Sequence, residues 1–459
     1  MTFTSNFFIT MIVPLIVLVT VFSRGNTRIN NIFIFVLSFL LLLINGIGNI
    51  RLVLFICVFD YLFIKCSNRR KDLFILAVVI NLIPLLFFKY TGFIRNNINM
   101  LTGLHINISQ STVPLGISFY TFESISILSD YYNGRLDNNI KLIDICFYLM
   151  FFVTVTSGPI IRFNDLLLQK YNRNISPENI NKGLERFIRG LGKKILLANN
   201  LALFADNVFS MYGSGGSFMI AELWLSSIAY MLQLYLDFSG YSDMAIGIGQ
   251  ISGFKIPENF NYPYTAKTFQ SFWRRWHITL SQWFRDYVYI PLGGNRVSVP
   301  RHILNLFVVW CLTGLWHGAN WTFIVWGGMN FILLVFEKYC HKVTKKLESS
   351  FIGHIYTLFF VNMCWIIFRS SSLSCAVSFI MGMFGFSKVY ATFDISVLKI
   401  VPLMIVSFIF CLPIKSIIHK NTDIKTYIIV KTAVLCIILL LSVLSISNTS
   451  YTPFIYGQF

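Results

Sequence analysis

Long apolar runs recur along nearly the whole chain, and short polar stretches separate them. The clearest runs occupy residues 7–22, 32–44, 52–64, 73–88, 303–316, 321–336, 355–368, 397–412 and 427–444. A helix needs about 20 residues to cross a bilayer, and several runs are shorter, so tilted, re-entrant or interfacial pieces are expected. The pattern predicts an all-α polytopic membrane protein with about ten to thirteen transmembrane or re-entrant helices.

Three stretches depart from this pattern. Residues 91–112 are polar and rich in Asn, which indicates a connection on the outer side. Residues 181–200 alternate basic and apolar positions, as an amphipathic helix at the cytoplasmic face would. Residues 254–301 are too polar to span and too aromatic for a plain loop, so they predict interfacial helices or a loop that dips into the membrane. No internal repeat is visible, and residues 1–459 are expected to form a single integral membrane domain.

Composition agrees with the membrane interpretation. The 459 residues are 56% hydrophobic and only 12% charged, whereas soluble proteins carry about 25% charged residues. A net charge of +18 would suggest nucleic acid in a soluble protein, but here basic loops on the cytoplasmic side explain it better, so no nucleic-acid partner is expected. The nine cysteines form no CxxC pair and no cluster with metal-ligand spacing, which favours buried free thiols and no metal site.

One histidine, His317, lies in the middle of a long apolar run, within the segment GLWHGANW at residues 314–321. An ionisable group at membrane depth is costly to place, so it is a functional candidate by default. A neutral imidazole can accept a proton, which suits a general base, and the flanking Trp316 and Asn320 could help to hold a substrate. The alternative is a histidine that only hydrogen-bonds neighbouring helices. The run is too long for one crossing, so the chain is expected to break near its glycines.

A second candidate is the alternation of aromatic and cationic residues at 272–287. Such a pattern suits the headgroup region of a membrane, which is its plain interpretation. It would also suit the mouth of a site for an anionic, adenine-bearing donor, in which arginines hold phosphates, tryptophans stack and a histidine orients a group. The residues concerned are Trp273, Arg274, Arg275, Trp276, His277 and Arg285.

A third candidate lies in the apolar segment 222–249. Gln233, Asp237 and Tyr241 share one helical face at four-residue spacing, and Asp243 follows. Two carboxylates could shift each other's protonation and move protons, or they could brace the arginines of the preceding candidate as structural ion pairs. Ion pairing is the preferred interpretation.

Taken together, these motifs resemble the membrane-bound O-acyltransferase (MBOAT) family, and within it the bacterial alginate O-acetyltransferase branch. The similar stretches cover essentially the whole chain, and they are residues 114–122, 157–163, 234–247, 257–260, 272–296, 314–326 and the tail at 453–456. The block at 272–296 and the later Trp-His-Gly are the most specific among them.

The resemblance implies helices arranged around a membrane-embedded tunnel. It also implies that His317 corresponds to the catalytic histidine of the family and His277 to a second, cytoplasm-side histidine. Members move an acyl group, in this branch acetyl, from a thioester donor such as acetyl-CoA to a hydroxyl, with no bound cofactor. The expected setting is the bilayer of the bacterial cytoplasmic (inner) membrane, with a polysaccharide acceptor and a periplasmic acetyltransferase partner.

Other functions stay open on sequence alone. Peptidoglycan O-acetylation and D-alanyl transfer to teichoic acid are similar enough to remain alternatives. A transporter or flippase could use Asp237 and Asp243 as coupling sites, although transporters tend to show paired halves. A scaffold that only docks the true acetyltransferase is a further alternative.

Overall fold

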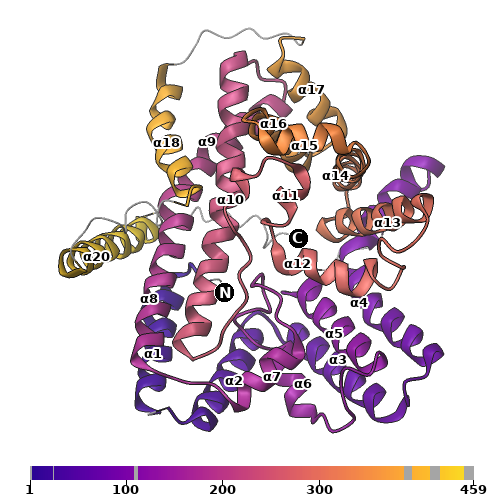
Figure 1. The fold of residues 1–459 in the computed structure, drawn as a ribbon, viewed down its shortest axis with the longest axis vertical. Coiled ribbons are helices and arrows are strands. Elements are labelled where there is room, and N and C mark those ends of the chain that lie inside the picture. Colours follow the sequence, from indigo (N-terminus) through magenta and orange to yellow (C-terminus); the bar gives the residue numbers. More distant parts are fainter. Residues whose placement is uncertain (1–2, 24, 108–111, 387–394, 414–423, 449–459) are drawn as a thin grey trace. The chain divides into compact units, whose positions relative to one another are not determined.

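The computed structural model describes residues 3–23, 25–107, 112–386, 395–413 and 424–448, and Figure 1 traces their helices. The family-like tail at 453–456 lies outside these residues. Contacts between residues divide the chain into two compact units. Unit 1 holds residues 1–187 and 244–257, and unit 2 holds residues 188–243 and 258–458.

Unit 1 is built from the first helices of the chain, of which those from η1 to α4 match the first four apolar runs. They are η1 (Phe8–Ile12), α1 (Val13–Phe22), α2 (Thr27–Ile44), α3 (Ile47–Cys66), α4 (Lys71–Thr102), α5 (Ile117–Tyr132), α6 (Leu142–Leu149), α7 (Phe163–Tyr171) and most of α8 (Pro177–Gly192). Helix α8 begins directly after Ser176, whose hydroxyl accepts a hydrogen bond from the backbone N–H of Asn179 at 3.2 Å. Serine is a preferred residue at this capping position.

Unit 2 combines long helices with several short ones. The long or apolar ones are α9 (Asn199–Gly213), α10 (Ile220–Ile251), α13 (Val299–His317), α14 (Trp321–Tyr339), α16 (Ile352–Arg369), α17 (Leu373–Met383), α18 (Val401–Phe410) and α20 (Ile424–Asn448). The others are η2 (Lys193–Ala198), η3 (Pro263–Thr265), α11 (Phe269–Trp273), α12 (Ile278–Phe284), η4 (Arg285–Tyr289), α15 (His341–Ser349) and η5 (Ile395–Ile400). Extended pairing within the described ranges is limited to an isolated bridge between Phe260 and Trp276.

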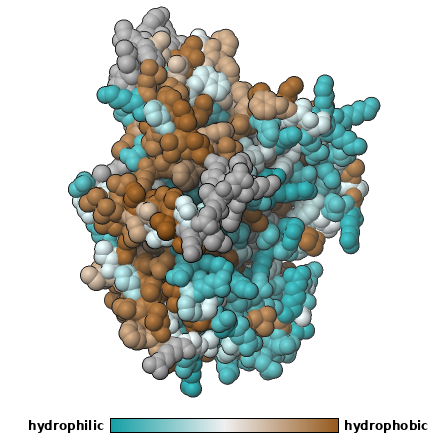
Figure 2. All heavy atoms as spheres, turned by 60° about the vertical axis from the view of Figure 1, so that its left-hand side comes forward, coloured by the Kyte–Doolittle hydropathy of each residue, from teal (hydrophilic) through white to brown (hydrophobic). Residues whose placement is uncertain are grey.

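The helices confirm a multi-pass membrane protein. Within the described ranges, six helices are long and apolar enough to cross a bilayer: α2, α3, α4, α13, α16 and residues 426–448 of α20. The pair α14 and α15, bent by 94°, could be a seventh, broken span or a re-entrant segment, and three shorter apolar helices occur at Phe8–Phe22, Leu373–Met383 and Val397–Phe410. Figure 2 shows apolar residues gathered over one face, and α20 exposes Ile429, Ile437 and Leu440. Such surface suits lipid contact rather than water.

Two of the three unusual stretches are helical as expected: residues 181–198 belong to α8 and η2, and residues 254–298 form only short helices. The long run 303–336 breaks after His317, where Gly318 is extended. The polar stretch at 91–112, expected to be a connection, is instead helical as far as Thr102. Polar residues do not end a helix by themselves, and α4 stops only at Gly103, whose φ of 70° is left-handed.

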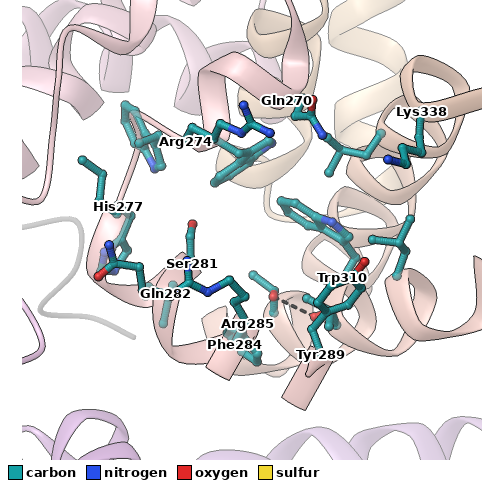
Figure 3. A pocket seen from close by; sticks show the side chains of 18 of the residues that line it. Gln270, Arg274, His277, Ser281, Gln282, Phe284, Arg285, Tyr289, Trp310 and Lys338 are labelled. Atoms are coloured by element: carbon teal, nitrogen blue, oxygen red, sulfur yellow. Dashed lines mark hydrogen bonds between the residues drawn. The ribbon is translucent and has the colours of Figure 1, made fainter. Parts of the chain in front are cut away.

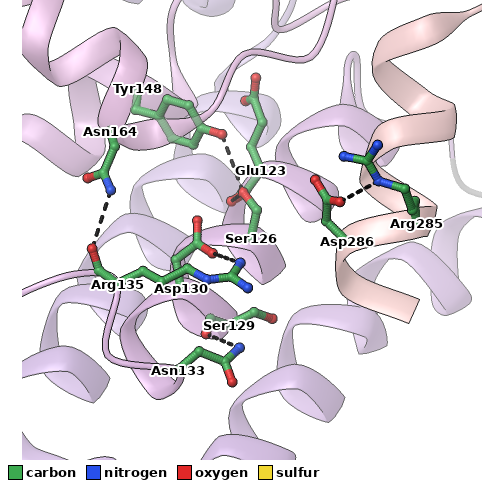
Figure 4. A network of polar contacts seen from close by, with 10 residues as sticks. All are labelled: Glu123, Ser126, Ser129, Asp130, Asn133, Arg135, Tyr148, Asn164, Arg285 and Asp286. Carbon is green, nitrogen blue, oxygen red and sulfur yellow. Dashed lines mark hydrogen bonds and ion pairs between the residues drawn. The ribbon is translucent and has the colours of Figure 1, made fainter. Parts of the chain in front are cut away.

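Polar side chains tie the short helices of unit 1 to α5 (Figure 4). The Thr154 hydroxyl donates to Glu123 of α5 at 3.2 Å, and the Tyr148 hydroxyl of α6 lies within hydrogen-bond distance, 3.4 Å, of the Ser126 hydroxyl of α5. Arg135 pairs with Asp130 at 3.1 Å. Because buried polar groups are costly unless hydrogen-bonded, these contacts fix the register of α5 against the neighbouring segments of unit 1.

Two glycines allow α13 and α14 to pack backbone against backbone in unit 2. A Cβ atom on Gly314 would lie 2.5 Å from the Phe323 carbonyl oxygen, and one on Gly327 would lie 2.5 Å from that of Trp310. Small residues at such crossings are the usual means of close helix packing in membranes. The absence of a side chain at Gly314 therefore allows α14 to pack closely against α13.

Replacing Gly327 with Ala should destabilise this helix pair by about 1–3 kcal/mol, because the added methyl group overlaps the Trp310 carbonyl. The neighbouring Gly328→Ala is the matched control, since no atom lies within 4 Å of its Cβ position and Ala favours a helix. Thermal unfolding in detergent should show a lower Tm for the first variant only. Equal Tm values for both variants would contradict the close packing.

Candidate active site

A cavity of about 560 Å³ lies within unit 2 among α11, α12, η4, α13 and α14 (Figure 3). This volume is in the range of pockets that hold a small molecule. The residues that line it include Gln270, Trp273, Arg274, Trp276, His277, Ser281, Gln282, Arg285, Tyr289, Asn295, His302, Trp310, Thr313, His317 and Lys338. The cavity thus brings together His277 and His317, which lie 40 positions apart in the sequence.

His317 is the last residue of α13 and is only 3% exposed. Aromatic rings surround the imidazole: Trp316, Trp326 and Phe368 lie edge to face with it, at centroid distances of 4.8, 4.9 and 5.1 Å. Such walls favour a neutral ring. The C-terminal end of α13 carries a partial negative charge, which would stabilise the imidazolium once the ring has accepted a proton.

His277 lies at the start of α12 and is 1% exposed. Its backbone has a φ of 45°, an uncommon conformation for a residue with a side chain. The ring packs edge to face on Phe238 at 4.7 Å and lies 6.1 Å from the Trp316 ring, which also contacts His317. Burial lowers the pKa of His277 to about 3, so the imidazole is neutral at physiological pH.

Tryptophans form one side of the cavity. Trp273 and Trp276 line it as predicted, together with Trp310 of α13. The Trp273 indole N–H donates to Asn330 Oδ1 at 3.0 Å, and its ring meets that of Trp310 at 4.8 Å. These contacts hold the rings in place and leave flat apolar faces for a substrate.

Three cations line the same cavity: Arg274, Arg285 and Lys338. Figure 3 shows them on different sides of the space, and Arg285 also pairs with Asp286 at 2.8 Å (Figure 4). The two arginines were predicted from the sequence, whereas Lys338 was not. It lies at the end of α14, where a single lysine after an apolar run is indistinguishable from an interfacial anchor.

His302 is a third histidine of the cavity, and it was not among the residues predicted from the sequence. Its Nε2 lies 2.8 Å from the Tyr289 hydroxyl, and its Nδ1 lies 2.7 Å from the Tyr339 hydroxyl. The ring therefore joins η4, α13 and α14 by hydrogen bonds on both nitrogens. No motif in the sequence signals this arrangement, because the three residues lie on separate elements.

Glu337 was also missed, although it fixes the position of α11. Its carboxylate oxygens accept the backbone N–H groups of Phe269 and Gln270 at 2.6 and 2.8 Å. A buried carboxylate at a helix N-terminus satisfies donors that the helix itself leaves unpaired. The contact holds α11 against α14, and α11 carries Trp273 into the cavity.

Three predicted site residues lie beside the cavity rather than among the described residues that line it. Arg275 donates to the Thr265 hydroxyl at 2.9 Å. Asn320 caps α14 by accepting from the Thr322 amide at 3.2 Å and donates to the Ser371 carbonyl at 3.0 Å. Trp316 lies between the rings of the two histidines. Their contacts are structural, and a direct role in substrate binding stays a prediction.

The two aspartates of α10 form ion pairs with η2. Asp237 pairs with Lys194, both almost fully buried, and Asp243 pairs with Lys193 at 2.8 Å. Gln233 is buried on the same helix. The two carboxylates therefore form ion pairs, as the preferred interpretation has it, but their partners are lysines and not the predicted arginines. Both partners, Lys193 and Lys194, lie in the stretch 181–200, whose amphipathic pattern led us to place them at the membrane surface.

Comparison with known proteins identifies the family of the chain. The profile of MBOAT, the membrane-bound O-acyltransferase family, matches residues 135–380, which include the whole lining of the cavity. The chain belongs to this family, and it is a membrane O-acyltransferase.

Three curated relatives show the range of similarity. The probable alginate O-acetylase AlgI of Pseudomonas syringae pv. tomato is 36% identical over 84% of this chain and 76% of its own length. The peptidoglycan O-acetyltransferase of Helicobacter pylori is 34% identical over 85% of this chain and 83% of its own. The teichoic acid D-alanyltransferase of Bacillus subtilis is 26% identical over 66% of this chain and 78% of its own.

The pair Lys194–Asp237 offers a test of the bracing role. Lys194→Met should destabilise the protein by about 3–5 kcal/mol, because it leaves a buried carboxylate without its cation. The double variant Lys194→Met/Asp237→Leu should recover most of that loss, since two apolar side chains replace two charges. Chemical unfolding in detergent measures both, together with acyl transfer. A stable double variant without any activity would indicate that the carboxylate acts in the reaction instead.

Proposed function

We propose that the protein is an O-acetyltransferase of the bacterial cytoplasmic (inner) membrane, which passes acetyl groups from a cytoplasmic thioester to extracytoplasmic polysaccharide. The observation that carries the proposal is the cavity in which His277 and His317 meet Arg274, Arg285 and Lys338. Two histidine side chains that can accept a proton, together with three cationic side chains, suit proton transfer beside an anionic donor. Because the family match at 135–380 crosses both units, we propose that the chain acts as a single integral membrane domain.

The donor in this proposal is acetyl-CoA or another acyl thioester. Its phosphate groups would bind Arg274, Arg285 and Lys338, and its thioester end would pass Trp273 and Trp276. The apolar walls would exclude water, which protects the thioester from hydrolysis. We propose that this cavity is the donor arm of the tunnel expected for the family.

His317 is proposed to act as general base. Its imidazole takes the proton of the acceptor hydroxyl while the hydroxyl oxygen attacks the thioester carbonyl carbon. The carbon–sulfur bond then breaks, and the leaving thiolate takes the proton from the imidazolium. The products are an ester and a thiol, with no net change in protons. The C-terminal end of α13 would stabilise the transient positive charge on the ring.

The acceptor is proposed to be a polysaccharide hydroxyl, reached directly or through a periplasmic acetyltransferase partner. The similarity to the alginate O-acetylase supports this choice. Peptidoglycan is the alternative acceptor and D-alanine the alternative acyl group, each in line with a relative of that name. Mass spectrometry of envelope glycans from cells with and without the gene would distinguish them, since acetyl and D-alanyl esters differ in mass.

His317→Ala should lower acetyl transfer by about 10²–10⁴-fold, because it removes the general base. The variant should still insert and purify as a folded protein, which gel filtration in detergent would show. His341→Ala is the control, since His341 is exposed at the start of α15. Transfer of labelled acetyl groups by purified protein is the measurement. Unchanged transfer in a folded His317→Ala variant would refute the assignment.

Arg274→Gln and Lys338→Gln should each raise the KM for the thioester donor by about tenfold or more, with a smaller effect on kcat. The reason is the loss of a charge-assisted contact to a donor phosphate in both ground state and transition state. Lys345→Gln is the control, because Lys345 is exposed on α15 and is not part of the cavity lining. If KM is unchanged for both cavity variants, the cations do not bind the donor.

A further inference from the structure

The side chain of Asn259, from another segment, contacts the imidazole of His277. Asn259 is fully buried, and its Oδ1 lies 3.0 Å from His277 Nδ1. The same oxygen accepts the Thr279 backbone N–H at 3.3 Å and the Thr279 hydroxyl at 3.0 Å. Asn259 is outside the residues predicted from the sequence, although the stretch 257–260 was among those similar to the family.

These contacts define which nitrogen of His277 carries the proton. A backbone N–H can only donate, so the Asn259 atom that it meets must be the carbonyl oxygen and not the amide nitrogen. An oxygen that only accepts requires a donor on the imidazole, which places the hydrogen on Nδ1. In a neutral ring, Nε2 then carries the lone pair.

The segment that contains Asn259 also fixes the backbone around His277. The Ile278 backbone N–H donates to the Asn259 carbonyl at 3.0 Å, and the Asn261 backbone N–H donates to the Arg275 carbonyl at 3.0 Å. This short bridge holds His277 at its left-handed φ of 45°, a conformation that a residue with a side chain keeps only when its surroundings impose it. Asn259 thus sets both the position of the ring and its tautomer.

We propose that Asn259 is a positioning residue that keeps His277 as the neutral Nδ1-protonated tautomer, so that Nε2 offers a lone pair to the N–H or S–H groups of the bound thioester or thiol. The inference rests on the proposed function. It gives the two histidines different tasks, since His277 would accept a hydrogen bond from the donor while His317 takes the proton of the acceptor. Burial keeps His277 neutral and therefore an acceptor.

Two aromatic rings and the titratable groups of the cavity surround His277. Phe238 of α10 and Trp316 of α13 cover its ring. The titratable and charged groups of the shared cavity are His317 and His302 of α13, Arg274 after α11, Arg285 and Tyr289 of η4, and Lys338 of α14. The cations disfavour an imidazolium, in agreement with a neutral His277.

The tautomer can be measured without any reaction. Protein labelled with ¹⁵N in its histidine rings, compared with a His277→Gln sample for assignment, should show His277 with a protonated Nδ1 and an unprotonated Nε2. In Asn259→Ala the signal should move toward a mixture of tautomers, whereas in Asn362→Ala it should not. Asn362 is a matched control, because it is buried in α16 and donates to the Ser227 hydroxyl. A protonated Nε2 in the native protein, or an unchanged spectrum in Asn259→Ala, would overturn the proposal.

Activity then tests the consequence. Asn259→Ala should lower kcat/KM for the thioester by about tenfold or more, and Asn259→Asp should restore part of it by keeping an acceptor oxygen. The Asp carboxylate favours the imidazolium, so the acidic limb of the kcat/KM profile should move to higher pH in that variant. If Asn259 has only a structural role, kcat/KM should fall in both variants, and the acidic limb of the profile should stay at the same pH. If the tautomer result holds but no acyl transfer is found, the proposed function fails while the positioning of His277 stands.

Discussion

The close approach of α13 and α14 is the constraint on which the candidate active site depends. Gly314 and Gly327 bring the two backbones together at a distance that any side chain would prevent. One helix of this pair carries His302 and His317, and the other carries Lys338. Water is absent from the membrane interior and cannot fill a poorly packed interface, so backbone packing of this kind positions groups that polar contacts alone could not.

Helix α14, the second of the pair, also positions the short helix α11. Its Glu337 receives the first backbone N–H groups of α11, and its Asn330 receives the Trp273 indole N–H. A helix of five residues has little stability of its own, because nucleation costs more than so few hydrogen bonds return. The aromatic and cationic mouth is therefore ordered by α14 rather than by its local sequence.

The sequence allowed a prediction of the helices and of the two histidines, because apolar runs and an isolated ionisable group at depth are local signals. The polar stretch before Thr102 was assigned wrongly, since polarity shows where a segment meets water and not where its helix ends. Lys338, His302 and Glu337 were missed for another reason. Each is ordinary within its own helix, and only packing between α11, α13 and α14 brings His302 and Lys338 to the cavity and Glu337 to the start of α11.

The two histidines of the cavity differ in ways that their chemistry would require. His317 ends a helix inside aromatic walls, where a positive charge is unfavourable except for the attraction of the helix end, so it suits a proton that is taken up and passed on quickly. His277 is fixed on one nitrogen by Asn259 and held at an unusual φ, so it suits a group whose orientation must not change. In the proposed mechanism Trp316, in contact with both rings, would separate the histidine that takes a proton from the histidine that binds the donor. Such a division would let one cavity hold the donor firmly while its general base stays neutral until the acceptor arrives.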